Sequence, residues 1–156
     1  MKVRDIMTQP ARTCAAETTV ATAGRRMQDG LCGILPVIDP RGKLIGVVTD
    51  RDLFLVTAGT RRSASNVTVH EAMTKKVTTC GPNDELAAAL TIMRTRGLRR
   101  LPVVDLDGHL LGLLSIDDIV RWGVNGNGVT ATDVVNALSD IVARRSAAME
   151  LDVADL

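Results

Sequence analysis

Residues 35–52 read LPVIDPRGKLIGVVTDRD, and residues 101–118 read LPVVDLDGHLLGLLSIDD. The two stretches lie 66 residues apart and align without a gap. In each, two apolar runs flank an Asp-x-x-Gly turn, and a Thr or Ser precedes an aspartate by three positions. Apolar runs joined by turn residues predict a β-hairpin, and runs that are apolar throughout predict that both faces are covered.

The similarity between the two stretches continues toward the N-terminus at the same offset. Val3 aligns with Val69, Met7-Thr8 with Met73-Thr74, Thr13-Cys14 with Thr79-Cys80, and Met27 with Met93. About sixteen of fifty-two positions are identical, and most of the others are similar. A fixed offset of this kind indicates two copies of one supersecondary unit, which we call repeat 1 and repeat 2.

Each repeat predicts the element order β-α-β-β-α, preceded by a short helical lead. The predicted lead helices are 3–7 and 69–73, and brief extended pieces follow at 13–14 and 79–80. The first long helix runs from about Thr19 to Met27 in repeat 1, and in repeat 2 from an N-cap at Asn83 or Asp84 through Met93. The predicted strands are 35–38, 44–49, 101–104 and 110–115, and the closing helices are 50–57 and 116–122. The predicted fold class is α+β, an α/β sandwich-like arrangement.

These elements divide the chain into residues 1–60 as module 1, 61–124 as module 2, and 125–156 as a hinge with a C-terminal amphipathic helix. That helix is predicted to begin at a Thr130 or Thr132 cap and to end near Met149. Its apolar residues are Val134, Val135, Leu138, Ile141 and Val142, which are predicted to line one face. Such a helix must pack on the body of the protein or on another subunit.

Composition excludes several classes of function. The 19 basic and 18 acidic residues leave a net charge of +1, which makes nucleic acid an unfavoured partner although four arginine pairs occur. The chain has no apolar run long enough to span a membrane and no signal peptide at its start, so we expect a cytoplasmic protein that does not bind membranes. Three cysteines without CxxC spacing and two distant histidines predict no metal site.

The Thr49-x-x-Asp52 and Ser115-x-x-Asp118 spacings have two interpretations. A hydroxyl followed three positions later by a carboxylate can form a capping box at the start of a helix. The same pair can bind a sugar phosphate, because a carboxylate accepts hydrogen bonds from both hydroxyls of a ribose and a strand-end hydroxyl reaches a phosphate. Spacing alone leaves both interpretations open, and the duplicated context favours binding.

Six motifs, in order and at a constant offset, make the chain resemble a tandem pair of CBS domains, the regulatory domain named after cystathionine β-synthase. They are residues 5–8 and 71–74, 35–39 and 101–105, and 46–52 and 112–118, and the resemblance covers about residues 2–124. It implies two modules packed about a pseudo-twofold axis, with two clefts that hold adenosine-containing ligands. It also implies a stand-alone CBS-domain protein that forms a homodimer.

The resemblance assigns residues to each cleft. One cleft combines Thr49, Arg51 and Asp52 with Leu98, Arg99, Arg100 and Pro102. The other combines Ser115 and Asp118 with Cys32, Gly33, Ile34 and Pro36, and Thr8 and Thr74 border the bases. Arg51 aligns with Asp117 and Arg100 with Ile34, so the cationic groups collect in the first cleft, which we expect to be the better phosphate site.

The predicted function is therefore a regulatory binding module for AMP, ADP, ATP or S-adenosylmethionine, without a cofactor and without catalytic activity. Its histidines align with Arg4 and Lys43 and lack a partner nucleophile, which argues against an enzyme. The alternative is an oligomerisation module whose clefts are empty.

Overall fold

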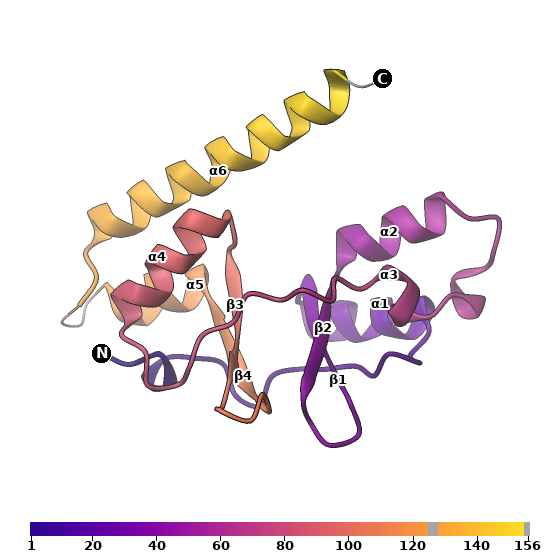
Figure 1. The fold of residues 1–156 in the computed structure, drawn as a ribbon, viewed down its shortest axis with the longest axis horizontal. Coiled ribbons are helices and arrows are strands. Elements are labelled where there is room, and N and C mark those ends of the chain that lie inside the picture. Colours follow the sequence, from indigo (N-terminus) through magenta and orange to yellow (C-terminus); the bar gives the residue numbers. More distant parts are fainter. Residues whose placement is uncertain (125–127, 155–156) are drawn as a thin grey trace. The chain divides into compact units, whose positions relative to one another are not determined.

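The computed structural model describes residues 1–124 and 128–154, with side chains described through Arg144. Repeat 1 contains η1 (Val3–Asp5), α1 (Val20–Asp29), β1 (Ile34–Ile38), β2 (Leu44–Thr49) and α2 (Asp50–Ala58). Repeat 2 contains α3 (Val69–Ala72), α4 (Leu86–Arg96), β3 (Arg100–Val104), β4 (Leu110–Ser115), α5 (Ile116–Asp118) and the π-helical segment η3 (Ile119–Gly123). A short 3-10 turn, η2 (Ala64–Asn66), lies between the repeats, and α6 (Ala131–Ala154) follows them (Figure 1). The order confirms the predicted repeat.

The two hairpins are antiparallel two-stranded sheets, β1-β2 and β3-β4. In the first, Ile34 pairs with Thr49 and Pro36 with Val47. The predicted extended pieces add one parallel bridge to each hairpin, because Cys14 pairs with Val37 and Cys80 with Val103. The first β of the predicted β-α-β-β-α unit is therefore a single bridge.

The hairpin turns have the geometry that their sequences predict. In repeat 1, Oδ1 of Asp39 accepts hydrogen bonds from the amides of Arg41 at 2.9 Å and Lys43 at 2.8 Å. Asp105 holds the second turn in the same way. Each turn closes on a glycine with positive φ, 82° at Gly42 and 84° at Gly108, a conformation that an L side chain rarely adopts.

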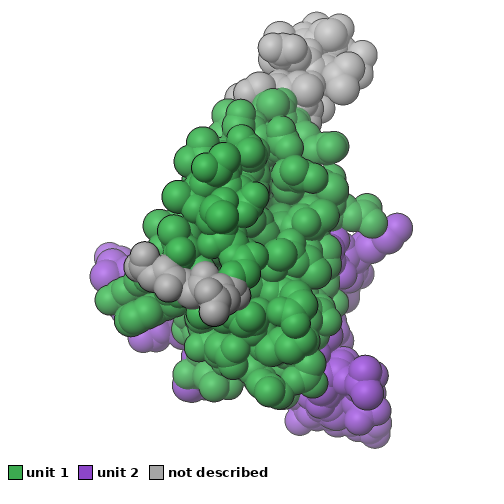
Figure 2. Space-filling model, turned by 90° about the vertical axis from the view of Figure 1, so that its left-hand side faces the viewer, with its two compact units in different colours: residues 1–9, 79–103, 111–156 green, residues 10–78, 104–110 purple. Residues whose placement is uncertain are grey.

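The chain folds into two compact units that differ from its two repeats (Figure 2). Unit 1 comprises residues 1–9, 79–103 and 111–156, and unit 2 comprises residues 10–78 and 104–110. The lead of repeat 1 therefore belongs with the body of repeat 2, and the lead of repeat 2 belongs with the body of repeat 1. The hairpin tip of repeat 2 also belongs to unit 2, where the amide of Leu44 donates to the carbonyl of Gly108 at 3.0 Å.

The exchange of leads is reciprocal at the level of individual hydrogen bonds. In unit 1, the amide of Val3 donates to the carbonyl of Asp84 at 3.0 Å; in unit 2, the equivalent amide of Val69 donates to Thr18 at 2.8 Å. The side chains of Val3 and Val69 are fully buried, each in the core of its own unit. Each unit thus takes one core residue from the lead of the other repeat.

Several predicted details are wrong. The N-cap of α4 is Glu85 and not Asn83 or Asp84, because the carboxylate of Asp84 instead accepts the amide of Gly81 at 2.8 Å. The lead of repeat 1 is one 3-10 turn and not a helix to Met7. The predicted last helix of repeat 2 is α-helical only to Asp118 and continues as η3.

The predicted apolar face of α6 is only partly buried. Val134 and Ile141 are buried in the core of unit 1, and Leu138 packs against that core. Val135 and Val142 are 64% and 50% exposed, so these two residues do not pack on the body of the chain, and their packing on another subunit stays a prediction. Thr130 is confirmed as the cap, since its hydroxyl accepts the amide of Asp133 at 3.1 Å, and its own amide and hydroxyl donate to the Asp133 carboxylate. Among the helices of residues 1–124 and 128–154, none combines the length and apolar character needed to cross a bilayer.

The exchange of leads predicts that core mutations act on the unit and not on the repeat. Truncating Val3 or Val69 to alanine removes two buried methyl groups and should cost about 2 kcal/mol of unfolding free energy. Val3→Ala should speed hydrogen exchange at the Leu113 amide, which donates to Thr8 in unit 1, more than at the Val47 amide, which donates to Thr74 in unit 2. Val69→Ala should do the reverse. Equal acceleration of both amides in both variants would contradict the prediction.

Candidate functional site

The Thr49-x-x-Asp52 motif lies where β2 ends and α2 begins. Thr49 is the N-cap, and its hydroxyl accepts the amide of Asp52 at 3.2 Å. In return, Oδ2 of Asp52 accepts the Thr49 amide at 2.8 Å and the Thr49 hydroxyl at 2.7 Å. The predicted capping box is therefore formed. Oδ1 of Asp52 accepts no hydrogen bond from a described residue.

The Ser115-x-x-Asp118 motif repeats this geometry between β4 and α5. The Ser115 amide and hydroxyl both donate to Oδ2 of Asp118, and the Asp118 amide donates back to Ser115 at 3.1 Å. Here the other carboxylate oxygen has a neighbour, because the Thr8 hydroxyl lies 3.5 Å from Oδ1. The two motifs are thus equivalent in backbone and differ at the free oxygen.

The capping boxes limit how each aspartate can bind a ribose. Oδ2 already accepts two hydrogen bonds, so only Oδ1 offers unused lone pairs while the box is intact. The expected contact in which both carboxylate oxygens bind the diol does not fit this geometry. A diol bound by Oδ1 alone does fit, since one carboxylate oxygen can accept two hydrogen bonds.

The two threonines that end the leads lie on the hairpins. Thr8 exchanges two backbone hydrogen bonds with Leu113 on β4, and Thr74 exchanges two with Val47 on β2. This close approach explains the glycine of each motif: a Cβ atom on Gly112 would lie 2.8 Å from the carbonyl oxygen of Thr8, and one on Gly46 would lie 3.0 Å from that of Thr74. The leads are thereby fixed two strand positions before Thr49 and Ser115.

The strand residues of the predicted clefts differ in exposure. Pro36 and Pro102 are buried, and their carbonyls accept the amides of Cys14 and Cys80, each at 3.1 Å. Ile34 and Arg100 are half-buried, and Arg99 is exposed. The Gly33 and Arg99 carbonyls accept the first amides of the closing helices, from Asp50 at 3.2 Å and Ile116 at 2.9 Å.

The structure brings the predicted residues together in two groups. Unit 2 holds Gly33, Ile34, Pro36, Thr49, Arg51, Asp52 and Thr74, and unit 1 holds Thr8, Arg99, Arg100, Pro102, Ser115 and Asp118. Each predicted cleft draws residues from both groups. The assignment of residues to clefts therefore stays a prediction.

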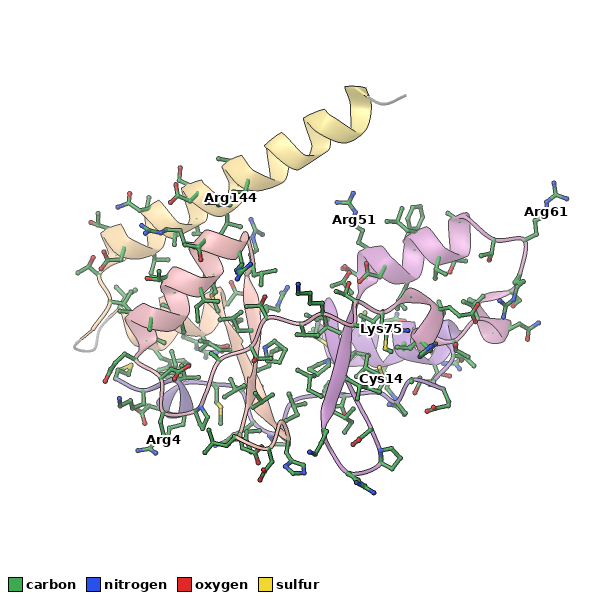
Figure 3. All side chains as sticks on the ribbon, viewed as in Figure 1. Arg4, Cys14, Arg51, Arg61, Lys75 and Arg144 are labelled. Atoms are coloured by element: carbon green, nitrogen blue, oxygen red, sulfur yellow. The ribbon has the colours of Figure 1, made fainter. Side chains whose placement is uncertain are left out.

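Two cations beside the unit 2 group were missed in the sequence. Lys75 and Lys76 directly follow Thr74 and are exposed, and Nζ of Lys75 lies 3.4 Å from Nε2 of His70 (Figure 3). Their repeat mates are Gln9 and Pro10, so the positive charge is specific to repeat 2. The signal was available in the sequence, because these lysines follow a threonine assigned to the base.

Two of the three cysteines, Cys14 and Cys80, lie in the core, and Cys32 is half-buried. Cys14 and Cys80 are buried, and burial raises the pKa of Cys14 to about 11 and that of Cys80 to about 12. A raised pKa favours the neutral thiol in the folded state, so this contribution to stability is present below about pH 9 and is lost as the pH rises toward these values. Neither is a reactive thiolate at neutral pH.

One further group of potential ligands lies in the second hairpin turn. Ligand atoms of Asp105, Asp107 and His109 lie within 4.8 Å of one another. Both carboxylate oxygens of Asp105 already have partners within the turn. Oδ1 accepts hydrogen bonds from the amides of Asp107 and His109, and Oδ2 lies 3.2 Å from Nδ1 of His109. These hydrogen bonds hold the pKa of Asp105 below its usual value. The arrangement agrees with the predicted turn.

Comparison with known proteins identifies the family. The CBS domain matches residues 3–59 and 69–125. The CBS domain-containing protein YhcV of Bacillus subtilis is 32% identical over 117 residues, 75% of this chain and 81% of YhcV. Several enzymes also match, among them inosine-5′-monophosphate dehydrogenases, but over only 22–23% of their own length.

Two solved structures of similar fold contain adenosine compounds. The CBS domain pair of protein MJ0100, in complex with 5′-methylthioadenosine and S-adenosyl-L-methionine, is 26% identical, with a TM-score of 0.70 over 78% of this chain and 94% of that one. CBSX2 in complex with AMP is 30% identical, with a TM-score of 0.69 over 79% of this chain and 96% of that one. The chain therefore belongs to the CBS-domain family and contains a tandem CBS pair followed by a C-terminal helix.

Proposed function

We propose that this protein is a regulatory sensor that binds adenosine-containing ligands through its two capped aspartates. The observation that carries the proposal is the Oδ1 atom of each aspartate: that of Asp52 accepts no hydrogen bond from a described residue, and that of Asp118 has the Thr8 hydroxyl at 3.5 Å. Each carboxylate is half-buried and is oriented by its capping box, so it needs little reorganisation to accept the hydroxyls of a ribose.

The relatives support this chemistry. S-adenosyl-L-methionine, 5′-methylthioadenosine and AMP share a ribose and an adenine, and each is bound by a CBS protein of similar fold. The chain has one phenylalanine, one tryptophan and no tyrosine. An adenine bound here must therefore pack against aliphatic side chains and backbone. We expect binding without catalysis.

The alternative function is assembly without a ligand. The capping boxes are compatible with this alternative, because both motifs stabilise the start of a helix whether or not a ligand is present. Under this alternative the hydroxyls and carboxylates are needed only for folding. A ligand titration separates the two functions.

Ligand binding should stabilise the folded protein. A ligand at a hundred times its Kd adds about 2.7 kcal/mol, which raises the Tm of a chain of this size by roughly 5–10 °C. Thermal unfolding with AMP, ADP, ATP and S-adenosylmethionine, and with GMP for comparison, measures the shift. An unchanged Tm with every adenosine compound at millimolar concentration would favour the assembly function.

Asp52→Asn and Asp118→Asn should each remove one binding event. An asparagine carbonyl can still accept the capping hydrogen bonds, whereas its NH₂ group puts a neutral donor where the charged acceptor was, so the O–H groups of a ribose lose that acceptor. The loss of a charged hydrogen bond costs about 1.5–3 kcal/mol, or roughly 10- to 150-fold in affinity measured by titration calorimetry.

The matched control is Asp133→Asn. Asp133 forms the same box with Thr130 at the start of α6, with the amide and hydroxyl contacts at 2.8 and 2.7 Å. It should show the effect of the substitution on stability and leave affinity unchanged. Wild-type affinity in both site variants would show that the motifs are caps only.

Charge should make the clefts unequal. We expect the cleft with Thr49 and Asp52 to prefer phosphorylated ligands, because Arg51 and Arg100 are assigned to it and a guanidinium donates two parallel hydrogen bonds to a phosphate. Arg100→Ala should therefore weaken AMP by about tenfold and adenosine hardly at all. Arg96→Ala, an exposed position on α4, is the control. Equal losses for AMP and adenosine would rule out a phosphate contact.

A further inference from the structure

The closing helices of the two repeats begin alike but continue differently. After its capping box, α2 stays α-helical from Asp50 to Ala58, whereas α5 ends at Asp118 and the chain continues as the π-helical segment η3. In η3 the amide of Val124 donates to the carbonyl of Ile119, five residues back, at 3.2 Å. A π-helical turn is a rare alternative to the α-helix and occurs frequently at functional sites. The packing around η3 must therefore hold this register.

Two residues of η3 make this packing. Gly123 is buried, and a Cβ atom there would lie 2.7 Å from Cδ2 of Leu86 on α4. Ile119 is fully buried. It shares one hydrophobic core with three residues of α6, namely Val134, Ala137 and Ile141. The π register of η3 therefore goes together with the seating of α6 on unit 1.

The equivalent segment of repeat 1 has a different environment. At the offset of 66 residues, Ile119 aligns with Leu53 on α2, which lines an open groove of about 480 Å³ in unit 2. The aspartates that precede these two residues differ as well. Oδ1 of Asp118 has the Thr8 hydroxyl at 3.5 Å, whereas Oδ1 of Asp52 accepts no hydrogen bond from a described residue. The two repeats therefore show one motif in two states: a π register with a helix seated on it and a neighbour at the carboxylate, and an α register with an open face and a free carboxylate oxygen.

We infer that α6 is the element of the chain that responds when a ligand binds at Asp118. The inference rests on the proposed function, in which ribose hydroxyls donate to Oδ1. Binding takes Oδ1 away from Thr8 and shifts repeat 2 toward the state of repeat 1, in which the segment after the aspartate is α-helical and its face is open. Because Ile119 directly follows Asp118, this change reaches the seat of α6 through one residue. A ligand at Asp52 acts instead on Leu53, which is not part of the core that α6 joins.

The seam between α4 and α6 leaves room for such a movement. A cavity of about 180 Å³ lies between the two helices, with Ala87 and Ala137 in its lining. Nε of Arg94 and Oδ2 of Asp140 form an ion pair across the seam at 3.7 Å, but both side chains are exposed, so the pair contributes little to stability. The buried residues around Ile119 therefore supply most of the attachment of α6.

Hydrogen exchange of the α6 amides tests the inference, with the two site variants of the full chain as matched partners. Asp52→Asn leaves only the site at Asp118, and Asp118→Asn leaves only the site at Asp52. Saturating AMP or S-adenosylmethionine should speed the exchange of residues 131–144 about tenfold in Asp52→Asn and leave it unchanged in Asp118→Asn. Unchanged or slower exchange in Asp52→Asn, when titration calorimetry shows the ligand bound, would overturn the inference and leave the proposed function intact. Calorimetry that shows no binding to either variant would instead contradict the proposed function itself.

The reverse effect gives a second test, because the seating of α6 must influence binding as much as binding influences the seating. Ile141→Val removes one methyl group from the core that holds α6. In the Asp52→Asn background it should strengthen AMP binding about threefold, and in the Asp118→Asn background it should leave the Kd unchanged. Val142→Ala, at an exposed position of the same helix, is the control and should change neither Kd. An unchanged Kd for Ile141→Val in the Asp52→Asn background would overturn the inference, since that is the result expected if α6 serves only to stabilise the fold.

Discussion

The structure depends on the backbone pairing of Thr8 with Leu113 and of Thr74 with Val47. Each pair joins the lead of one repeat to the hairpin in the body of the other. The approach is so close that only glycine fits at positions 46 and 112. The pairing buries Val3 and Val69 and places a threonine near the end of β4 and of β2. The core of each unit and the surroundings of its capped aspartate therefore have a common origin.

In both aspartate motifs the capping box uses one carboxylate oxygen, so the cap is compatible with the proposed binding role of the same side chain. Oδ2 of each aspartate accepts the N-cap amide at the start of the helix, and these hydrogen bonds fix the direction of Oδ1. Under the proposed function, the cap also orients the oxygen that would accept the ribose hydroxyls. Capping and binding, which the spacing offers as alternatives, are therefore compatible in this geometry.

The repeat, the hairpins, their turns and the family could be predicted from the sequence, because they rest on local patterns that occur twice. The predictions that are wrong concern features that depend on competition between neighbouring groups for the same contact. Asn83 or Asp84 was expected to cap α4, but the Asp84 carboxylate accepts the Gly81 amide instead. Val135 and Val142 fit the apolar pattern of α6, yet the helix presents only the Val134 and Ile141 side of its stripe to the core. The exchange of leads has no local signature, since the two similar leads have the same sequence pattern whichever body they join.

That exchange has a consequence for how such a chain can originate. In a protein consisting of one repeat, the lead would have no hairpin of a second repeat to pair with in its own chain. Its stable form would therefore be a pair of chains that exchange their leads. Joining two such chains end to end through a linker such as residues 59–68 gives the order of elements found in this chain. After fusion the sequences of the two bodies are free to diverge. In repeat 2, Gly97 has a φ of 68° and lies beside the Arg144 side chain of α6, whereas its equivalent in repeat 1 is Leu31, which has a φ of 48° and is exposed.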